Sequence, residues 1–126
     1  MHGILLVGHG SLLKHATGGM YQLAEEIRQR QGIEVVEVAF LDLCPPDIPT
    51  GVLSCVKKGV TDLTVIPYFL SDGFLMRKAE RIVKQEVEDY RGMTMRFGDP
   101  IGFDPRIVHV LKDRIKEAWA DQEESK

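Results

Sequence analysis

The sequence lacks the signatures of several common protein classes. Its 126 residues include only two cysteines, Cys44 and Cys55, with neither CxxC spacing nor a nearby histidine pattern. This excludes a zinc knuckle or a redox pair, and we expect both cysteines to behave as buried small apolar residues. Acidic residues outnumber Lys and Arg by 19 to 16, for a net charge of −3. A nucleic-acid-binding surface needs a concentrated basic excess, so we expect no nucleic-acid partner.

Long hydrophobic segments are missing as well. No apolar run reaches the roughly 18 residues that cross a bilayer, and no basic and then apolar signal segment precedes the first apolar run. We therefore expect no membrane partner and a cytoplasmic location. The length and the 44% hydrophobic content predict one globular domain over residues 1–120, followed by a charged tail over 121–126 that should fray.

The chain alternates between two hydrophobic periods. Runs rich in Val, Ile and Leu predict four strands, near residues 4–7, 33–41, 61–67 and 93–97. Apolar residues at helical spacing predict a helix after each strand, near residues 20–31, 47–58, 75–91 and from 105 onward. The apolar face of the last helix consists of Ile107, Val108, Leu111, Ile115 and Ala118.

Such alternation predicts an α/β fold, a parallel sheet with helices on both faces. A flavodoxin-like strand order of 2-1-3-4 would place the loops after the first and third strands side by side.

The first predicted strand runs directly into the turn from Gly8 to Ser11, where His9 stands between two glycines. This turn matches neither the GxGxxG motif of dinucleotide-binding proteins, nor the GxxxxGK[ST] phosphate-binding loop, nor the GxSxG nucleophile elbow. The sequence therefore does not support any of these three functions. A neutral imidazole is both a metal ligand and a base that titrates near physiological pH. At a strand end facing the ligand crevice, His9 could hold a divalent metal ion, remove a proton, or simply bond a loop carbonyl.

Other polar residues allow two interpretations each. His15, in the same loop, could supply a second imidazole or be a plain exposed residue, whereas His2 and His109 are interpreted as structural or solvent-facing. Lys and Arg usually lie in solvent, but they can also bind the carboxylates of an acidic ligand. The basic residues concerned are Lys14, Arg77 and Lys78. Asp42 and Asp104 could likewise be plain surface residues or belong to the site, and Asp104 is most simply a helix N-cap.

Four segments together resemble the short-form class II chelatases, which insert cobalt, nickel or iron into sirohydrochlorin-type tetrapyrroles for cobalamin or sirohaem synthesis. The segments are residues 5–11, 38–42 with the following turn 46–49, 65–70 and 98–102. The resemblance implies a homodimer, a divalent metal ion as substrate rather than a prosthetic group, and His9 as metal ligand and catalytic base. The residues expected to contact the tetrapyrrole are Gly10, Ser11, Lys14, Phe74, Arg77 and Lys78.

The sequence departs from the family pattern at the second metal-binding histidine, where it has Phe74. Lys78 stands in the place of an acidic residue, and Asp104 in that of a histidine before proline. One imidazole binds a divalent ion much more weakly than two. Either His9 works alone, or another side chain completes the site, or catalysis is lost while binding is kept. The candidates for completing the site are His15, Asp72 and Met76.

Phe74 itself could stack on a flat macrocycle or anchor the start of its helix. The missing second histidine leaves an alternative function, a noncatalytic tetrapyrrole or metal carrier, or the partner subunit of an active relative.

Overall fold

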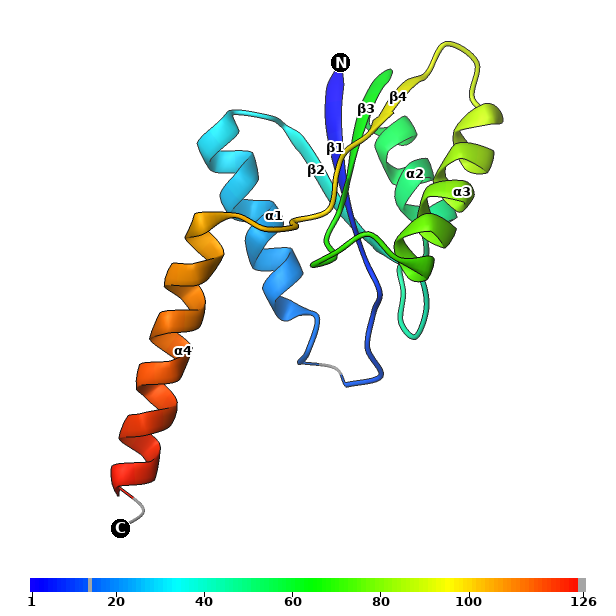
Figure 1. The fold of residues 1–126 in the computed structure, drawn as a ribbon. Helices are drawn as coiled ribbons and strands as arrows, with labels where there is room; N and C mark the ends of the chain where they lie inside the picture. The colour runs from blue at the N-terminus through cyan, green and yellow to red at the C-terminus, as the bar shows by residue number, and fades with distance from the viewer. Residues whose placement is uncertain (14, 125–126) are drawn as a thin grey trace.

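The computed structural model describes residues 1–13 and 15–124. It contains four strands and four helices in strict alternation, as the sequence predicts (Figure 1). In chain order they are β1 (His2–Gly8), α1 (Gly18–Gln31), β2 (Val35–Phe40), α2 (Ile48–Lys57), β3 (Asp62–Pro67), α3 (Phe74–Glu88), β4 (Thr94–Phe97) and α4 (Pro105–Glu124). All strand pairs are parallel and the order is β2-β1-β3-β4, so the predicted topology is confirmed.

The sheet is buried on both sides at β1. Leu5 and Val7 point into a core shared with α2 and α3, whereas Leu6 points into a second core under α1. All three side chains are at most 1% exposed. A central parallel strand covered on both faces is apolar without alternation, which is why β1 reads as a continuous apolar run.

The N-terminus of α2 is fixed by a side-chain cap. The Asp47 carboxylate accepts a hydrogen bond from the Thr50 backbone N–H at 2.9 Å, and Pro49 lies in the first turn. This hydrogen bonding to Thr50 lowers the pKa of Asp47 from its ordinary value. The cap satisfies one of the free N–H groups that every helix start exposes.

Replacing Asp47 by Ala should lower the free energy of unfolding by about 1 kcal/mol at neutral pH. Because the folded pKa is depressed, this contribution is complete above the unfolded pKa near 4 and is lost as pH falls through the lower folded pKa. Urea unfolding at pH 7 and in acid should therefore show the cost shrinking in acid. Asp47→Asn, which caps without titrating, is the control, and an equal cost of Asp47→Ala at both pH values would contradict this account.

The last helix stands apart from the other elements. It leaves the body of the domain and extends past the carboxyl ends of the strands (Figure 1). Val108 and Leu111 are 52% and 56% exposed, and within the described residues α4 makes no extensive contact with another element. The helix continues to Glu124, so the first residues of the predicted frayed tail are helical. The division into a domain and a tail stays a prediction.

The two cysteines differ in their surroundings. Cys55 is fully buried in α2, and burial, with a smaller effect of the nearby Glu37 carboxylate, raises the pKa of its thiol to about 12. It therefore stays protonated at neutral pH and supplies no thiolate ligand. Cys44 is only half-buried, so the expectation of a buried residue is confirmed for Cys55 alone.

No helix among the described residues is long and apolar enough to span a bilayer.

Candidate functional site

The loops that follow the strands are joined at the carboxyl edge of the sheet. The backbone N–H of Leu41, after β2, donates to the Gly8 carbonyl at 2.8 Å, and that of Tyr68, after β3, donates to the Val7 carbonyl at 2.7 Å. The loop after β4 joins in turn, because the N–H of Ile101 donates to the Phe69 carbonyl at 2.9 Å. The predicted neighbourhood of the loops after β1 and β3 is thus confirmed.

His9 follows β1 directly and lies exposed at the centre of this edge. Its own carbonyl accepts a hydrogen bond from the Asp42 N–H at 3.0 Å, which fixes the backbone of the turn. The next residue, Gly10, has a φ of +103°, and a Cβ there would lie 1.9 Å from the Asp42 carbonyl oxygen. Glycine is therefore required for the β1 turn to pack against the loop after β2, and this packing places the imidazole.

A local hydrogen bond holds the rest of the loop after β1. The Ser11 hydroxyl oxygen accepts a hydrogen bond from the Leu13 N–H at 3.1 Å, which leaves its own hydrogen free to donate. His15 is exposed in the same loop. Lys14, a predicted substrate contact, lies outside the described residues. Contacts of Gly10 and Ser11 with substrate stay predictions.

The start of α3 presents an aromatic side chain and two cations. Phe74 is the first residue of the helix and is 74% exposed, so it does not anchor the helix in the core. The guanidinium of Arg77 forms two hydrogen bonds to Asp72, at 2.9 and 2.6 Å, and this pairing raises the pKa of Arg77. Lys78 is exposed on α3. Arg77 is thus already paired with a carboxylate, which an acidic ligand would have to share or displace.

The structure narrows the candidates for a second metal ligand. Met76 is 6% exposed and packs into the domain, and Asp72 is engaged by Arg77. Asp104 caps α4 by accepting from the Arg106 N–H at 2.9 Å, and hydrogen bonds from Arg106 hold the pKa of its carboxyl well below the usual range. Over residues 1–13 and 15–121, no three His, Cys, Asp or Glu side chains form a group able to hold a metal ion. His9 is accordingly not built into a closed metal centre.

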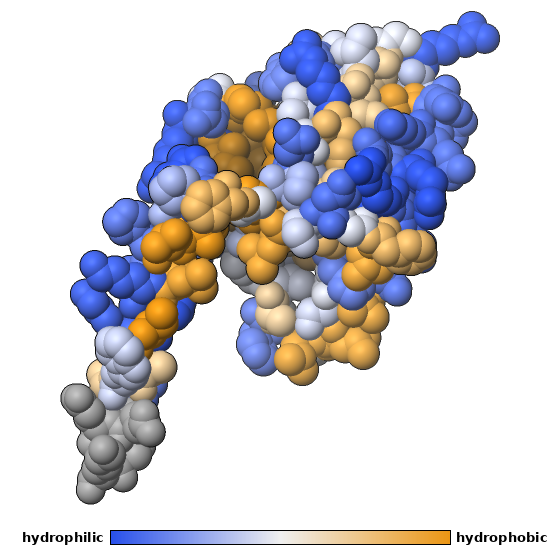
Figure 2. Space-filling view, viewed as in Figure 1, coloured by the Kyte–Doolittle hydropathy of each residue, from blue (hydrophilic) through white to orange (hydrophobic). Residues whose placement is uncertain are grey.

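Phe74 belongs to a larger set of exposed apolar side chains, in the loops of this edge and at the start of α3, that the sequence did not reveal. Seven large side chains there are 42% to 89% exposed. We call them the apolar rim: Leu12, Leu13, Leu43, Tyr68, Leu70, Phe74 and Phe103. Hydrophobic colour gathers at the lower end of the domain in Figure 2, where the loops after β1 and β2 lie. Concentrated exposed apolar surface marks a binding site, and large apolar residues inside predicted loops are the signal that could have revealed it.

Comparisons with known proteins agree on one family. The family model described as CbiX matches residues 3–118. A sirohydrochlorin cobaltochelatase of Methanopyrus kandleri is 30% identical, with 97% of this chain and 100% of that protein covered. A sirohydrochlorin ferrochelatase of Bacillus subtilis is 31% identical over 98% of this chain, but only 48% of the relative is covered. The chain thus spans the whole of one relative and about half of the other.

The solved structures that resemble this chain belong to the same family. A CbiX protein from Marinobacter aquaeolei, described as a putative cobalamin biosynthesis protein, has a TM-score of 0.74 and 30% identity, with 96% of this chain and 99% of that chain covered. The sirohydrochlorin chelatase SirB of Bacillus subtilis subspecies spizizenii, in complex with cobalt, has a TM-score of 0.85 and 31% identity. Here 92% of this chain and 50% of the SirB chain are covered.

Proposed function

This chain belongs to the CbiX family, and from that premise we propose that it inserts a divalent metal ion, cobalt first or else nickel or iron, into a sirohydrochlorin-type tetrapyrrole. The observation that carries the proposal is an exposed imidazole, His9, at a sheet edge surrounded by the apolar rim. Relatives named as cobaltochelatases and ferrochelatases, and SirB structures with Fe³⁺ and with cobalt, support it. The metal ion is a substrate here, and no prosthetic group is needed.

The proposed chemistry uses few groups. Insertion of a divalent ion displaces two protons from the pyrrole nitrogens of the macrocycle. His9 in its neutral form can accept one of these protons and release it to water, while the second proton passes directly to solvent; the same imidazole can hand over a bound metal ion. The apolar rim would hold the flat ring while Lys78 attracts its peripheral carboxylates. Catalysis on this account is positioning plus proton removal.

Phe74 should contribute binding through ring stacking. We expect Phe74→Ala to weaken tetrapyrrole binding by about 1.4 kcal/mol, or about tenfold in Kd, and Phe74→Tyr to keep it. The check is an absorbance titration of metal-free sirohydrochlorin into each variant under anaerobic conditions. Unchanged affinity of Phe74→Ala would show that this side chain does not meet the macrocycle.

The replacement of the second histidine by Phe74 favours a second candidate, a tetrapyrrole carrier without catalysis. Anaerobic absorbance assays with Co²⁺, Ni²⁺ or Fe²⁺ separate the two functions, with wild type, Phe74→His and a protein-free mixture run in parallel. The chelatase proposal expects wild type to exceed the protein-free rate. If wild type only matches that rate while binding the tetrapyrrole, and Phe74→His gains activity, the carrier is the function.

We also propose that the active species is a homodimer. A single copy leaves His9 and the apolar rim open to solvent, and the chain matches about half the length of the Bacillus relatives. A second copy would supply a comparable length of protein to close the site. The cytoplasmic location stays a prediction.

A further inference from the structure

The start of α3 places an aromatic ring next to a row of basic side chains. Phe74 begins the helix, at the carboxyl end of the sheet (Figure 1). Arg77 and Lys78 follow three and four residues later and Arg81 comes one turn after them, and all four residues are exposed. Residues at these spacings are neighbours on one face of a helix. A ligand seated on Phe74 therefore has positive charge beside it, although the whole chain carries a net charge of −3.

Arg77 already binds a carboxylate. Its Nε donates a hydrogen bond to Asp72 Oδ1 at 2.9 Å, and its Nη2 donates one to Asp72 Oδ2 at 2.6 Å. A guanidinium binds carboxylates of any source in this two-point geometry, because the spacing of its N–H groups matches the two oxygens. Asp72 therefore occupies, with a carboxylate of the chain itself, the place that the carboxylate of a ligand would take.

Within the described residues, the Asp72 carboxylate is held by Arg77 alone. Both of its side-chain hydrogen bonds go to that guanidinium. Asp72 does not cap α3, because the N-cap residue is Gly73 and this cap has no side-chain hydrogen bond. The side chains of Arg77 and Asp72 are 61% and 49% exposed. An exposed ion pair of this kind adds little stability in water, so the bond can be given up at small cost.

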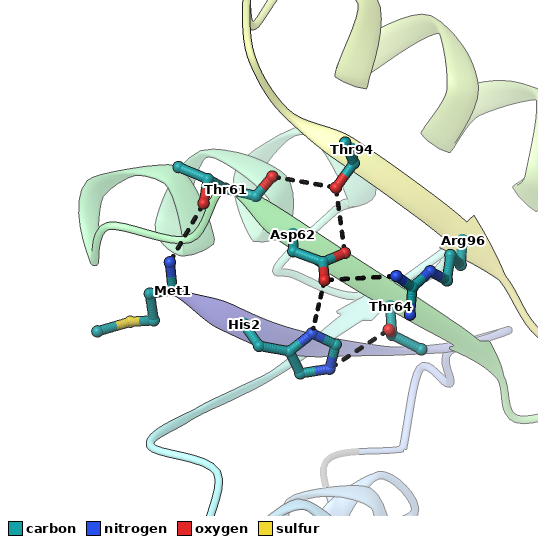
Figure 3. A network of polar contacts seen from close by, with 7 residues as sticks. All are labelled: Met1, His2, Thr61, Asp62, Thr64, Thr94 and Arg96. Atoms are coloured by element: carbon teal, nitrogen blue, oxygen red, sulfur yellow. Dashed lines mark hydrogen bonds and ion pairs between the residues drawn. The ribbon is translucent and has the colours of Figure 1, made fainter.

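Asp62, at the opposite end of β3, is a carboxylate with a structural role. It bonds His2 Nδ1 at 3.2 Å and accepts a hydrogen bond from the Thr94 hydroxyl at 3.1 Å (Figure 3). The Arg96 guanidinium lies 3.6 Å from the same carboxylate. These partners belong to β1 and β4, so Asp62 connects three strands. The bond of Asp72, by contrast, stays within one turn of chain and the helix that follows it.

We infer that Asp72 is an internal competitor for Arg77, which a carboxylate at the edge of the tetrapyrrole displaces when the ring stacks on Phe74. Arg77 then has a carboxylate partner before and after binding, so its guanidinium is never left unpaired under the ligand. Lys78 and Arg81 lie further along the same helix face and meet neighbouring acidic groups. This inference rests on the proposed tetrapyrrole binding and identifies what is recognised, the acidic side chains of the macrocycle.

The exchange makes binding selective for acidic rings. A macrocycle without carboxylates at its edge cannot replace Asp72 at Arg77, so it gains only the stacking on Phe74. A free carboxylate without a ring has to compete with Asp72, which is tethered beside Arg77 and therefore has the advantage of an intramolecular partner. Only a ligand that carries both a flat ring and carboxylates overcomes this competition.

The direct test follows the Asp72 carboxylate itself by NMR, in protein whose aspartate carboxyl carbons are labelled with carbon-13. The Asp72 resonance is identified by its loss in Asp72→Asn. Metal-free sirohydrochlorin, added anaerobically, should move this resonance to the position that it has in ligand-free Arg77→Gln, where Asp72 is unpaired. The Asp62 resonance should stay in place and is the control. An Asp72 resonance that does not move while sirohydrochlorin binds overturns the inference.

Absorbance titrations of metal-free sirohydrochlorin give a second test. Arg77→Lys keeps the charge but loses the two-point geometry, so its Kd should rise about threefold. Asp72→Asn removes the competitor, so its Kd should fall about threefold, within the range by which exposed ion pairs shift an equilibrium. Arg91→Lys and Glu88→Gln, near the other end of α3, are the matched controls and should keep the wild-type Kd. Unchanged Kd values in both Arg77→Lys and Asp72→Asn contradict the exchange.

The exchange and the proposed function fail in different ways. Both tests use the metal-free ring, so a protein that shows the exchange without inserting metal disproves only the chelatase activity. A protein that binds sirohydrochlorin while Asp72 stays on Arg77 disproves only the exchange. A protein that does not bind sirohydrochlorin disproves both.

Discussion

His9→Ala should reduce metal insertion by about 10² fold or more, to the rate of the protein-free reaction. Alanine can neither bind the metal ion nor accept a pyrrole proton, and general-base groups contribute about 10²- to 10⁴-fold. The described part of the chain holds no three-ligand group that could bind the metal ion in its place. Because His9 is exposed and makes no core contact, the variant should fold and still bind sirohydrochlorin. The measurement is the initial rate of Co²⁺ insertion, followed by absorbance.

The controls for this variant are two other exposed histidines, His15 and His109. His15→Ala and His109→Ala should retain the wild-type rate, since neither lies at the turn that ends β1. If His15→Ala loses as much activity as His9→Ala, the loop after β1 supplies two imidazoles and the one-histidine account is wrong. Full activity of His9→Ala would contradict the assignment altogether.

Gly10→Ala should be the most destabilising single substitution at the site. A Cβ at this position would meet the Asp42 carbonyl oxygen at 1.9 Å, and the φ of +103° is strained for any L side chain. Positive-φ strain alone costs about 1–2 kcal/mol, and displacing a hydrogen-bonded loop adds to it, so we expect a loss of about 3 kcal/mol in the free energy of unfolding. Urea unfolding measures the loss directly.

Gly59→Ala is the matched control for the steric part. Its φ is +92°, but a Cβ there would have no neighbour within 4 Å. It should therefore show only the conformational strain, about 1–2 kcal/mol. Equal losses of unfolding free energy in the two variants would contradict this account. They would mean that the loop after β2 can move away from the β1 turn without loss of stability, and that Gly10 does not fix the position of His9.

The parts of this structure that were predictable from the sequence are those set by local patterns. A buried parallel strand has to be apolar on both faces, so residues 4–7 identify β1, and the glycines around His9 identify the turn at its end. The alternation of strands and helices predicted a parallel sheet, whereas the order 2-1-3-4 was expected only by analogy with flavodoxin-like folds, and the structure has that order. Asp47 and Asp104 were recognisable as caps by their place before a proline-containing first turn.

The parts that were not predictable depend on what meets a surface. Periodicity reveals the apolar face of α4 but not what covers it, and in the structure Val108 and Leu111 on that face are exposed. The pairing of Arg77 with Asp72 required the geometry of the turn before α3. Phe74 was ambiguous between anchor and platform, and its 74% exposure excludes the anchor.

The central claim is that a single imidazole at an apolar sheet edge is sufficient to catalyse metal insertion. It is tested most directly by the initial rate of Co²⁺ insertion into sirohydrochlorin with wild-type protein, anaerobically, against the protein-free mixture at the same concentrations. The account predicts that the protein raises the rate well above the protein-free value. A rate equal to that value, with sirohydrochlorin demonstrably bound, would contradict it and leave a carrier in place of an enzyme.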